Sequence, residues 1–108
     1  MIDHGKEEPT DLFEVHLQRW YNDTPIEVRI DNTQIFNDTV TTGYILALAK
    51  IIPFNINKGT HTLSVKIADS ISSETTFTIS DTLYIAVNYN STTSEIAFII
   101  QKNPFYYR

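Results

Sequence analysis

The 108-residue chain contains no cysteine, and its three glycines stand far apart, at positions 5, 43 and 59. The absence of thiols excludes a disulfide framework, a cysteine-ligated zinc site and a cysteine nucleophile. Neither the clustered glycines of a phosphate-binding loop nor the Gly-x-Ser-x-Gly elbow of a serine hydrolase is present. The histidines at positions 4, 16 and 61 lack metal-ligand spacing. We therefore expect that the protein is not an enzyme and that it binds neither a metal nor a cofactor.

Positive charge and long apolar runs are also scarce. Eight Lys and Arg stand against thirteen Asp and Glu, which gives a net charge of −5, and the cationic residues form no cluster. Such a surface would on average repel a phosphate backbone, so nucleic acid is not an expected partner. No apolar run approaches the roughly 18 residues of a membrane-spanning helix, so no membrane span is expected.

The chain does contain the period-two alternation that is typical of half-buried β-strands. In the segment 12–21, Phe13, Val15 and Leu17 share one face, whereas His16 and Trp20 lie on the other. Similar alternation recurs at 26–30, 74–80, 83–89 and 96–100. We predict an all-β fold, an antiparallel two-sheet β-sandwich of about seven strands, with a polar leader at 1–11 and one domain at 12–108.

The segment 44–67 predicts a β-hairpin. Tyr44 to Ala49 is apolar at every position, as in a buried strand, and Lys58-Gly59 supplies a two-residue turn in which glycine takes the positive φ. Pro53 cannot donate to a central ladder, so we expect an edge position there, with a bulge or a strand break just before it.

Two further turns are predicted from the register of their flanking strands. Asn32-Thr33 is expected to place Ile30 opposite Ile35. In the last hairpin, Asn90 faces Glu95 across a four-residue turn. This second register forms an outer-face patch that is less polar than a solvated sheet face should be, made of Tyr84, Ala86, Ala97 and Ile99.

Several aromatic residues stand outside the predicted core faces. Trp20 falls on the polar face of the first strand and Tyr21 follows it, so either ring could stack on a sugar or a partner, or close the end of the sandwich. After Pro104, a tail of three aromatic residues either packs over the open end of the sandwich or reaches a partner. The candidate contact residues are Trp20, Tyr21, Tyr84, Ile99, Phe105, Tyr106 and Tyr107.

Two segments resemble known sequence patterns. Residues 26–36 are similar to the strand-turn-strand opening of bacterial extracytoplasmic β-sandwich modules, and residues 58–65 resemble their recurring Gly-x-His-x-Leu-x-Val strand. The chain is thus similar to immunoglobulin-like sandwich domains, although Asn32-Thr33 stands where glycine is common. The resemblance implies a non-catalytic module in the periplasm or at the cell surface, and it carries no functional residue across.

Two functions follow as hypotheses. The first is a structural or protein-interaction module of a bacterial envelope or secreted protein, acting through the outer-face patch or an exposed strand edge. The second is a carbohydrate-binding module, in which exposed aromatic rings stack on sugars and nearby polar groups bond to hydroxyls. The leader at 1–11 would suit a lipoprotein whose signal has been removed. The expected partner is a protein or an envelope polysaccharide outside the cytoplasm.

Overall fold

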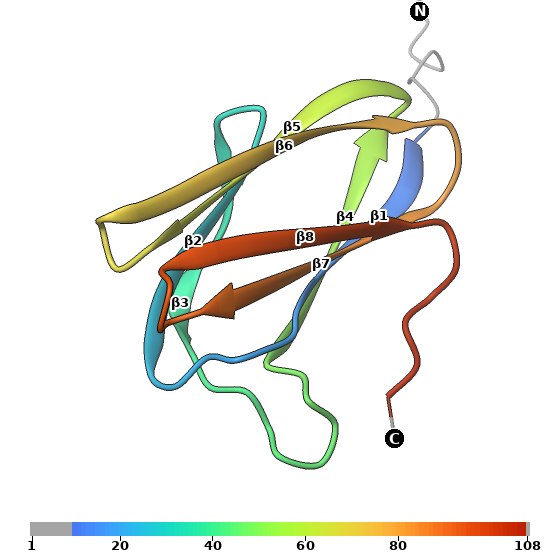
Figure 1. Cartoon of the computed structure of the whole chain (residues 1–108). Helices are drawn as coiled ribbons and strands as arrows, with labels where there is room; N and C mark the ends of the chain where they lie inside the picture. The colour runs from blue at the N-terminus through green and yellow to red at the C-terminus, as the bar shows by residue number, and fades with distance from the viewer. Residues whose placement is uncertain (1–9, 108) are drawn as a thin grey trace, which may run out of the picture.

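The computed structural model describes residues 10–107 and shows an all-β fold of eight strands (Figure 1). The strands are β1 Thr10–Leu17, β2 Thr24–Ile30, β3 Thr33–Val40, β4 Lys50–Asn57, β5 Gly59–Ile67, β6 Ile71–Ile79, β7 Leu83–Asn90 and β8 Glu95–Gln101. Within residues 10–107 there is no helix long and apolar enough to cross a membrane. The leader predicted at 1–11 lies outside the described residues except for Thr10 and Asp11, which already belong to β1.

The strands form two four-stranded sheets, which we call sheet A, with the order β4-β1-β7-β8, and sheet B, with the order β3-β2-β5-β6. The predicted two-sheet β-sandwich is confirmed, with eight strands in place of about seven. All pairings are antiparallel except that of β1 with β7, which is parallel. A parallel pair needs a long connection, and here the five intervening strands supply it.

The core lies between the sheets and is built from their inward-facing residues. Phe13 of β1 and Phe77 of β6 stack across it, with ring centroids 4.8 Å apart and planes at 10°. The predicted alternation is present along β1, β2 and β6, because a pleated strand sends successive side chains to opposite faces. Fully buried side chains include Phe13, Val15, Leu17, Ile26, Val28, Leu63, Val65, Ile67, Ile79, Ile85 and Val87.

The predicted hairpin at 44–67 is wrong. β4 pairs with β1 in sheet A, whereas β5 pairs with β2 and β6 in sheet B. The chain changes sheet at Lys58 and Gly59, and Gly59 takes a φ of +119° at this corner. Inward-facing apolar residues alternate in the same way in a hairpin and in a crossover between two sheets, so the sequence pattern did not distinguish them.

Residues 44–49 form an exposed loop instead of the predicted buried strand. Tyr44 is 95% exposed and Ile45 is 84% exposed. The loop closes on itself, because the Ala47 N–H donates to the Gly43 carbonyl and the Gly43 N–H donates to the Leu48 carbonyl, both at 3.1 Å. These local bonds satisfy backbone groups that a strand would pair with a neighbour.

β4 itself lies at an edge of sheet A, as its proline predicts. The predicted bulge or break is absent, since β4 pairs with β1 from Lys50 to Asn57 without a register shift.

The two predicted turns have different outcomes. The last hairpin has the predicted register. Between β2 and β3 the turn is Asp31-Asn32, so Ile30 pairs with Thr33 and not with Ile35. Both turn residues have positive φ, 50° and 71°. Asp and Asn adopt this conformation more readily than β-branched Thr33 does, which moves the turn by one residue.

A polar cluster ties this turn to the crossover between β4 and β5. His61 Nδ1 lies 2.6 Å from Asp31 Oδ2, and His61 Nε2 lies 2.7 Å from the carbonyl oxygen of Asn57. The Thr62 N–H donates to Asp31 Oδ1 at 2.9 Å. Both partners of the imidazole are acceptors, so both ring nitrogens act as donors and the geometry fits the protonated ring.

The two aromatic residues after β1 lie in different environments. Tyr21 is buried, its hydroxyl donates to the Val87 carbonyl at 2.7 Å, and its ring stacks on Tyr89 with centroids 6.2 Å apart. Tyr21 thus closes one end of the sandwich, and burial raises the pKa of its phenol well above the usual range. Trp20, one residue earlier, is 58% exposed.

Candidate functional site

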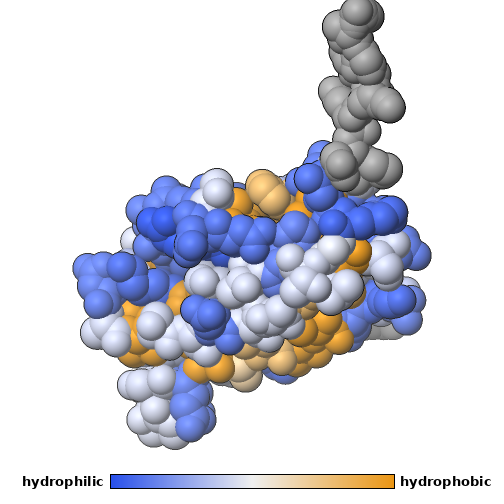
Figure 2. Space-filling view, turned by 90° about the horizontal axis from the view of Figure 1, so that it is seen from above, coloured by the Kyte–Doolittle hydropathy of each residue, from blue (hydrophilic) through white to orange (hydrophobic). Residues whose placement is uncertain are grey.

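The outer faces of the two sheets differ in polarity. Sheet B carries polar residues outward, including Glu27, which lies 2.6 Å from Arg29 and 3.8 Å from Lys66. β5 and β6 lie at the top of Figure 1, and the molecule seen from above is largely hydrophilic, with hydrophobic residues mainly toward the lower border of the view (Figure 2). Sheet A carries apolar or aromatic residues outward on every strand, namely Leu12, Ile51, Pro53, Tyr84, Ala86 and Ile99. The outer face of sheet A is therefore the candidate functional surface.

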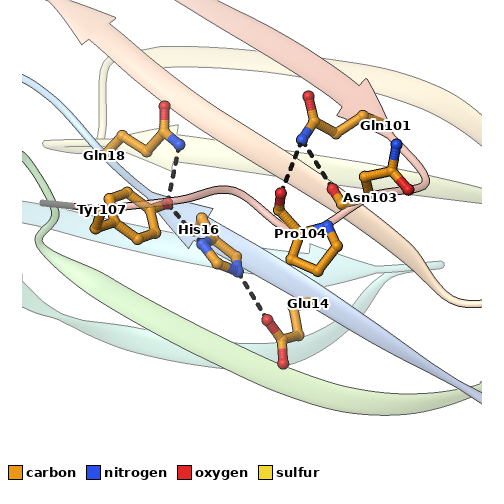
Figure 3. A network of polar contacts seen from close by, with 7 residues as sticks. All are labelled: Glu14, His16, Gln18, Gln101, Asn103, Pro104 and Tyr107. Atoms are coloured by element: carbon orange, nitrogen blue, oxygen red, sulfur yellow. Dashed lines mark hydrogen bonds and ion pairs between the residues drawn. The ribbon is translucent and has the colours of Figure 1, made fainter.

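Part of this face is covered by the C-terminal tail, residues 102–107. At the start of the tail, the Gln101 side chain donates to the Asn103 carbonyl at 2.8 Å, and the chain then crosses toward β1 (Figure 3). Phe105 and Tyr107 pack on the ring of His16, with centroids 5.2 Å and 5.7 Å away. His16 is only 3% exposed, although it faces away from the core.

A row of hydrogen bonds holds the tail on β1. Tyr107 Oη accepts from Gln18 Nε2 at 2.9 Å and lies 2.7 Å from His16 Nδ1, while His16 Nε2 lies 2.8 Å from Glu14 Oε1 (Figure 3). With the His16 proton on Nε2, each contact has one donor and one acceptor: Gln18 donates to Tyr107, Tyr107 to His16, and His16 to Glu14. Burial raises the pKa of the Tyr107 phenol, which keeps this donor protonated.

Carboxylate, imidazole and hydroxyl in a row are also the parts of a nucleophilic site. Here the hydroxyl of Tyr107 is the group that fastens the tail, and the imidazole of His16 is enclosed by two aromatic rings. A reacting group must be reachable by a substrate, which this imidazole is not. We assign the row of side chains to attachment of the tail.

The tail therefore packs on a sheet face and not over the open end of the sandwich. Tyr84 is half-buried and meets His16 edge-on at 6.1 Å, and Ala86 is fully buried. Of the patch expected from the sequence, Ala97 and Ile99 on β8 stay exposed, with Ile99 at 46%. In the tail itself, Tyr106 points outward and is 82% exposed.

The other half of the outer face is open and forms a groove beside Trp20. Beyond β1 the chain continues parallel to β7, because the Trp20 N–H donates to the Tyr89 carbonyl at 2.9 Å and the Tyr89 N–H donates to the Arg19 carbonyl at 2.7 Å. This pairing brings Trp20 beside Asn90, which faces Glu95 of β8. The hollow, which we call the Trp20 groove, has a volume of about 530 Å³; its lining includes Arg19, Trp20, Asn88, Asn90, Glu95 and Ala97.

A second, smaller hollow of about 350 Å³ lies where the loop at 44–49 meets the tail. Its lining includes Ile45, Leu46, Tyr106 and Tyr107. The sequence analysis did not identify this hollow, because it predicted a buried strand at 44–49.

Among the strands of residues 10–107, β8 lies at a free edge of sheet A. It pairs with β7 on one side, and alternate N–H and C=O groups on its other side point away from the sheet. Its sequence has no proline and no lysine, and its one charge stands at the first position, Glu95. Ile100 pairs with the core residue Ile85, yet it is 44% exposed, so the sandwich covers this strand incompletely.

Compared with known proteins, the chain matches no family model and no curated sequence. The resemblance to immunoglobulin-like modules therefore stays a prediction from the two sequence segments that carry it, whereas the sandwich is a property of the structure.

Sequence reasoning missed the role of His16. The alternation places it on the face away from the core, and its partner Tyr107 stands 91 residues further along the chain. The available signal was a row of three hydrogen-bonding side chains on one strand face, Glu14, His16 and Gln18. The sequence also contains an aromatic tail, but it does not place this tail on that face.

Proposed function

We propose that the chain is a non-catalytic structural or protein-interaction module of a bacterial envelope or secreted protein, and that it associates with a second copy of itself through the free edge of β8. The observation that carries the proposal is the unprotected edge, where Ile99 and Ile100 are exposed on opposite faces of one apolar strand. Natural sheets normally protect such an edge with lysine, proline, a bulge or a short strand.

Two of the three other edges carry such protection, and the third, β6, carries the exposed charge of Glu74 within the strand. β4, at the far side of sheet A, carries Lys50 and Pro53. β3, an edge of sheet B, carries Asp38 and pairs with β2 across a register shift between Val28 and Arg29. β8 differs from both of these edges, which favours a role in association.

The sequence of β8 is complementary to itself in an antiparallel register centred on Phe98. In this register Ile96 faces Ile100 on the inner side, and Ala97 faces Ile99 on the outer side. A two-fold axis through Phe98 therefore extends the ladder of sheet A into the second copy and covers both exposed isoleucines.

The proposed location is the periplasm or the cell surface. It is supported by the resemblance of residues 26–36 and 58–65 to bacterial extracytoplasmic modules.

Charged variants of β8 test the proposal by sedimentation equilibrium, with chain concentrations from about 10 to about 500 µM. Wild type is expected to form a dimer whose fraction rises with concentration. Ile99→Lys and Ala97→Glu each introduce an unpaired charge at the interface, so neither variant alone should dimerise. Because position 99 of one copy faces position 97 of the other, an equimolar mixture of the two variants should recover a dimer.

The matched control is Thr76→Lys, which places the same charge on the exposed face of β6, an edge strand of sheet B. This variant should dimerise like wild type. A wild-type chain that stays monomeric over the whole range, or a dimer that persists in Ile99→Lys, would refute association through β8. A mixture that fails to associate would refute the register centred on Phe98.

A further inference from the structure

The Trp20 groove presents an exposed aromatic ring that is held firmly by its neighbours. Trp20 is the only tryptophan of the chain. Its backbone N–H donates to the Tyr89 carbonyl of β7, and the next residue, Tyr21, is buried in the core. The guanidinium carbon of Arg19 lies 5.6 Å from the indole centroid, over one face of the ring. The sheet and the core thus fix the backbone at Trp20, and the indole offers its other face as a platform for a ligand.

Two polar side chains beside the ring are held in place by their own turn. Asn90 Oδ1 accepts from the N–H groups of Thr92 and Thr93 at 3.0 Å and 3.3 Å. Glu95 Oε1 accepts from the Thr93 hydroxyl at 3.2 Å. Among the hydrogen bonds within residues 10–107, none uses Asn90 Nδ2 or Glu95 Oε2, so a donor nitrogen and an acceptor oxygen remain for a ligand.

The spacing of these groups fits a chain of sugar rings. Trp20, which follows β1, lies beside Asn90 at the end of β7, and Asn90 faces Glu95 at the start of β8. Adjacent strands of a sheet are about 4.8 Å apart. This distance is close to the repeat between successive pyranose rings, so a ring stacked on the indole would place hydroxyls of the same or the next sugar at Asn90 and Glu95.

The charges of the groove select a neutral ligand. Arg19 and Glu95 offset each other, while the whole chain carries a net charge of −5 and would repel a polyanion. Hydroxyls both donate and accept, which matches an amide nitrogen and a carboxylate oxygen side by side. We propose that the Trp20 groove binds a neutral saccharide chain. This proposal does not rest on association through β8, although Glu95 and Ala97 belong to both surfaces.

Fluorescence of the single tryptophan tests the proposal directly. The probes are soluble neutral polysaccharides, namely a β-glucan, a xylan, a galactomannan and soluble starch, with polygalacturonate as the acidic comparison. At least one neutral probe should shift the emission maximum to the blue and protect Trp20 from iodide quenching, whereas polygalacturonate should do neither. If none of the four neutral probes changes the emission or the quenching, the proposal is overturned.

Affinity electrophoresis in gels containing the active polysaccharide then assigns the residues. Trp20→Ala should weaken binding at least about tenfold, as expected for loss of a central aromatic contact. Asn90→Asp keeps the acceptor that caps the turn and removes the free donor, so it should weaken binding about threefold to tenfold.

The control variants separate this site from the other surfaces. Tyr106→Ala removes a still more exposed aromatic ring outside the groove and should leave retardation unchanged. Ile99→Lys should also bind the polysaccharide normally. Saccharide binding and dimer formation are therefore tested by different variants, and one proposal can fail without the other. Retardation that survives Trp20→Ala but is lost in Tyr106→Ala would overturn the assignment to the Trp20 groove.

Discussion

The contact between His61 and Asp31 should make the stability of the sandwich depend on pH. Partial burial lowers the pKa of His61, but the hydrogen bonds to Asp31 and to the Asn57 carbonyl outweigh it, and the pKa lies above the usual 6.5. The bonds from His61 and from the Thr62 N–H hold the pKa of Asp31 below its usual 3.8, against a smaller opposing effect of burial. Both shifts favour the charged pair in the folded chain.

The sign of the effect follows from proton linkage. A raised pKa means that the folded chain binds the proton of His61 more tightly than the unfolded chain, so this stabilisation is fully present below the unfolded pKa of about 6.5 and is lost as pH rises through the folded pKa. The lowered pKa of Asp31 acts in the opposite direction. Its contribution is present above about 3.8 and is lost as pH falls through the folded pKa.

The magnitude is limited by solvent. The side chain of His61 is 15% exposed, but that of Asp31 is 50% exposed, so water screens the pair. We therefore expect the pair to stabilise the folded chain by about 0.5 to 1 kcal/mol, which is the contribution of a favourable exposed ion pair. Wild type should lose this amount of unfolding free energy between about pH 5.5 and about pH 8.5, a range that spans the ordinary titration of histidine.

Urea unfolding at these two pH values, applied to wild type, His61→Gln and Asp31→Asn, measures the effect. Asparagine is the matched replacement at position 31, because it tolerates the positive φ of 50° found there. Both variants should lack the loss seen in wild type between the two pH values. The three chains differ only at positions 31 and 61, so the comparison isolates this pair. A His61→Gln variant with the same pH dependence as wild type would show that the reasoning about this pair is wrong.

Three further changes test the core, the tail and the exposed loop by urea unfolding. Phe77→Ala should lower the free energy of unfolding by about 3 to 5 kcal/mol, because it leaves a cavity beside Phe13; a loss below about 1 kcal/mol would contradict the stacked core. Tyr107→Phe should cost about 1 to 2 kcal/mol, since the buried His16 loses its hydrogen-bond partner, and unchanged stability would contradict the attachment of the tail. Ile45→Ser should change stability by less than about 0.5 kcal/mol because the side chain is 84% exposed; a loss of several kcal/mol would instead support a buried strand at 44–49.

The amino-acid sequence by itself determined which side of most strands faces the core. Phe13, Val15 and Leu17 alternate with polar residues, and in a pleated strand such alternation admits one assignment of faces. The register of the last hairpin was also predictable, because its short turn leaves few ways to match two apolar faces.

Only the tertiary structure decided which strands share a sheet and what covers the outer faces. An apolar face must be buried, but its pattern does not name the partner, so β4 and β5 could equally have formed a hairpin or, as they do, entered different sheets. The same holds for the parallel pairing of β1 with β7 and for the contact of Tyr107 with His16. These contacts join residues far apart in the chain, and they form because the packed sandwich brings complementary hydrogen-bonding groups together, a property that local periodicity does not contain.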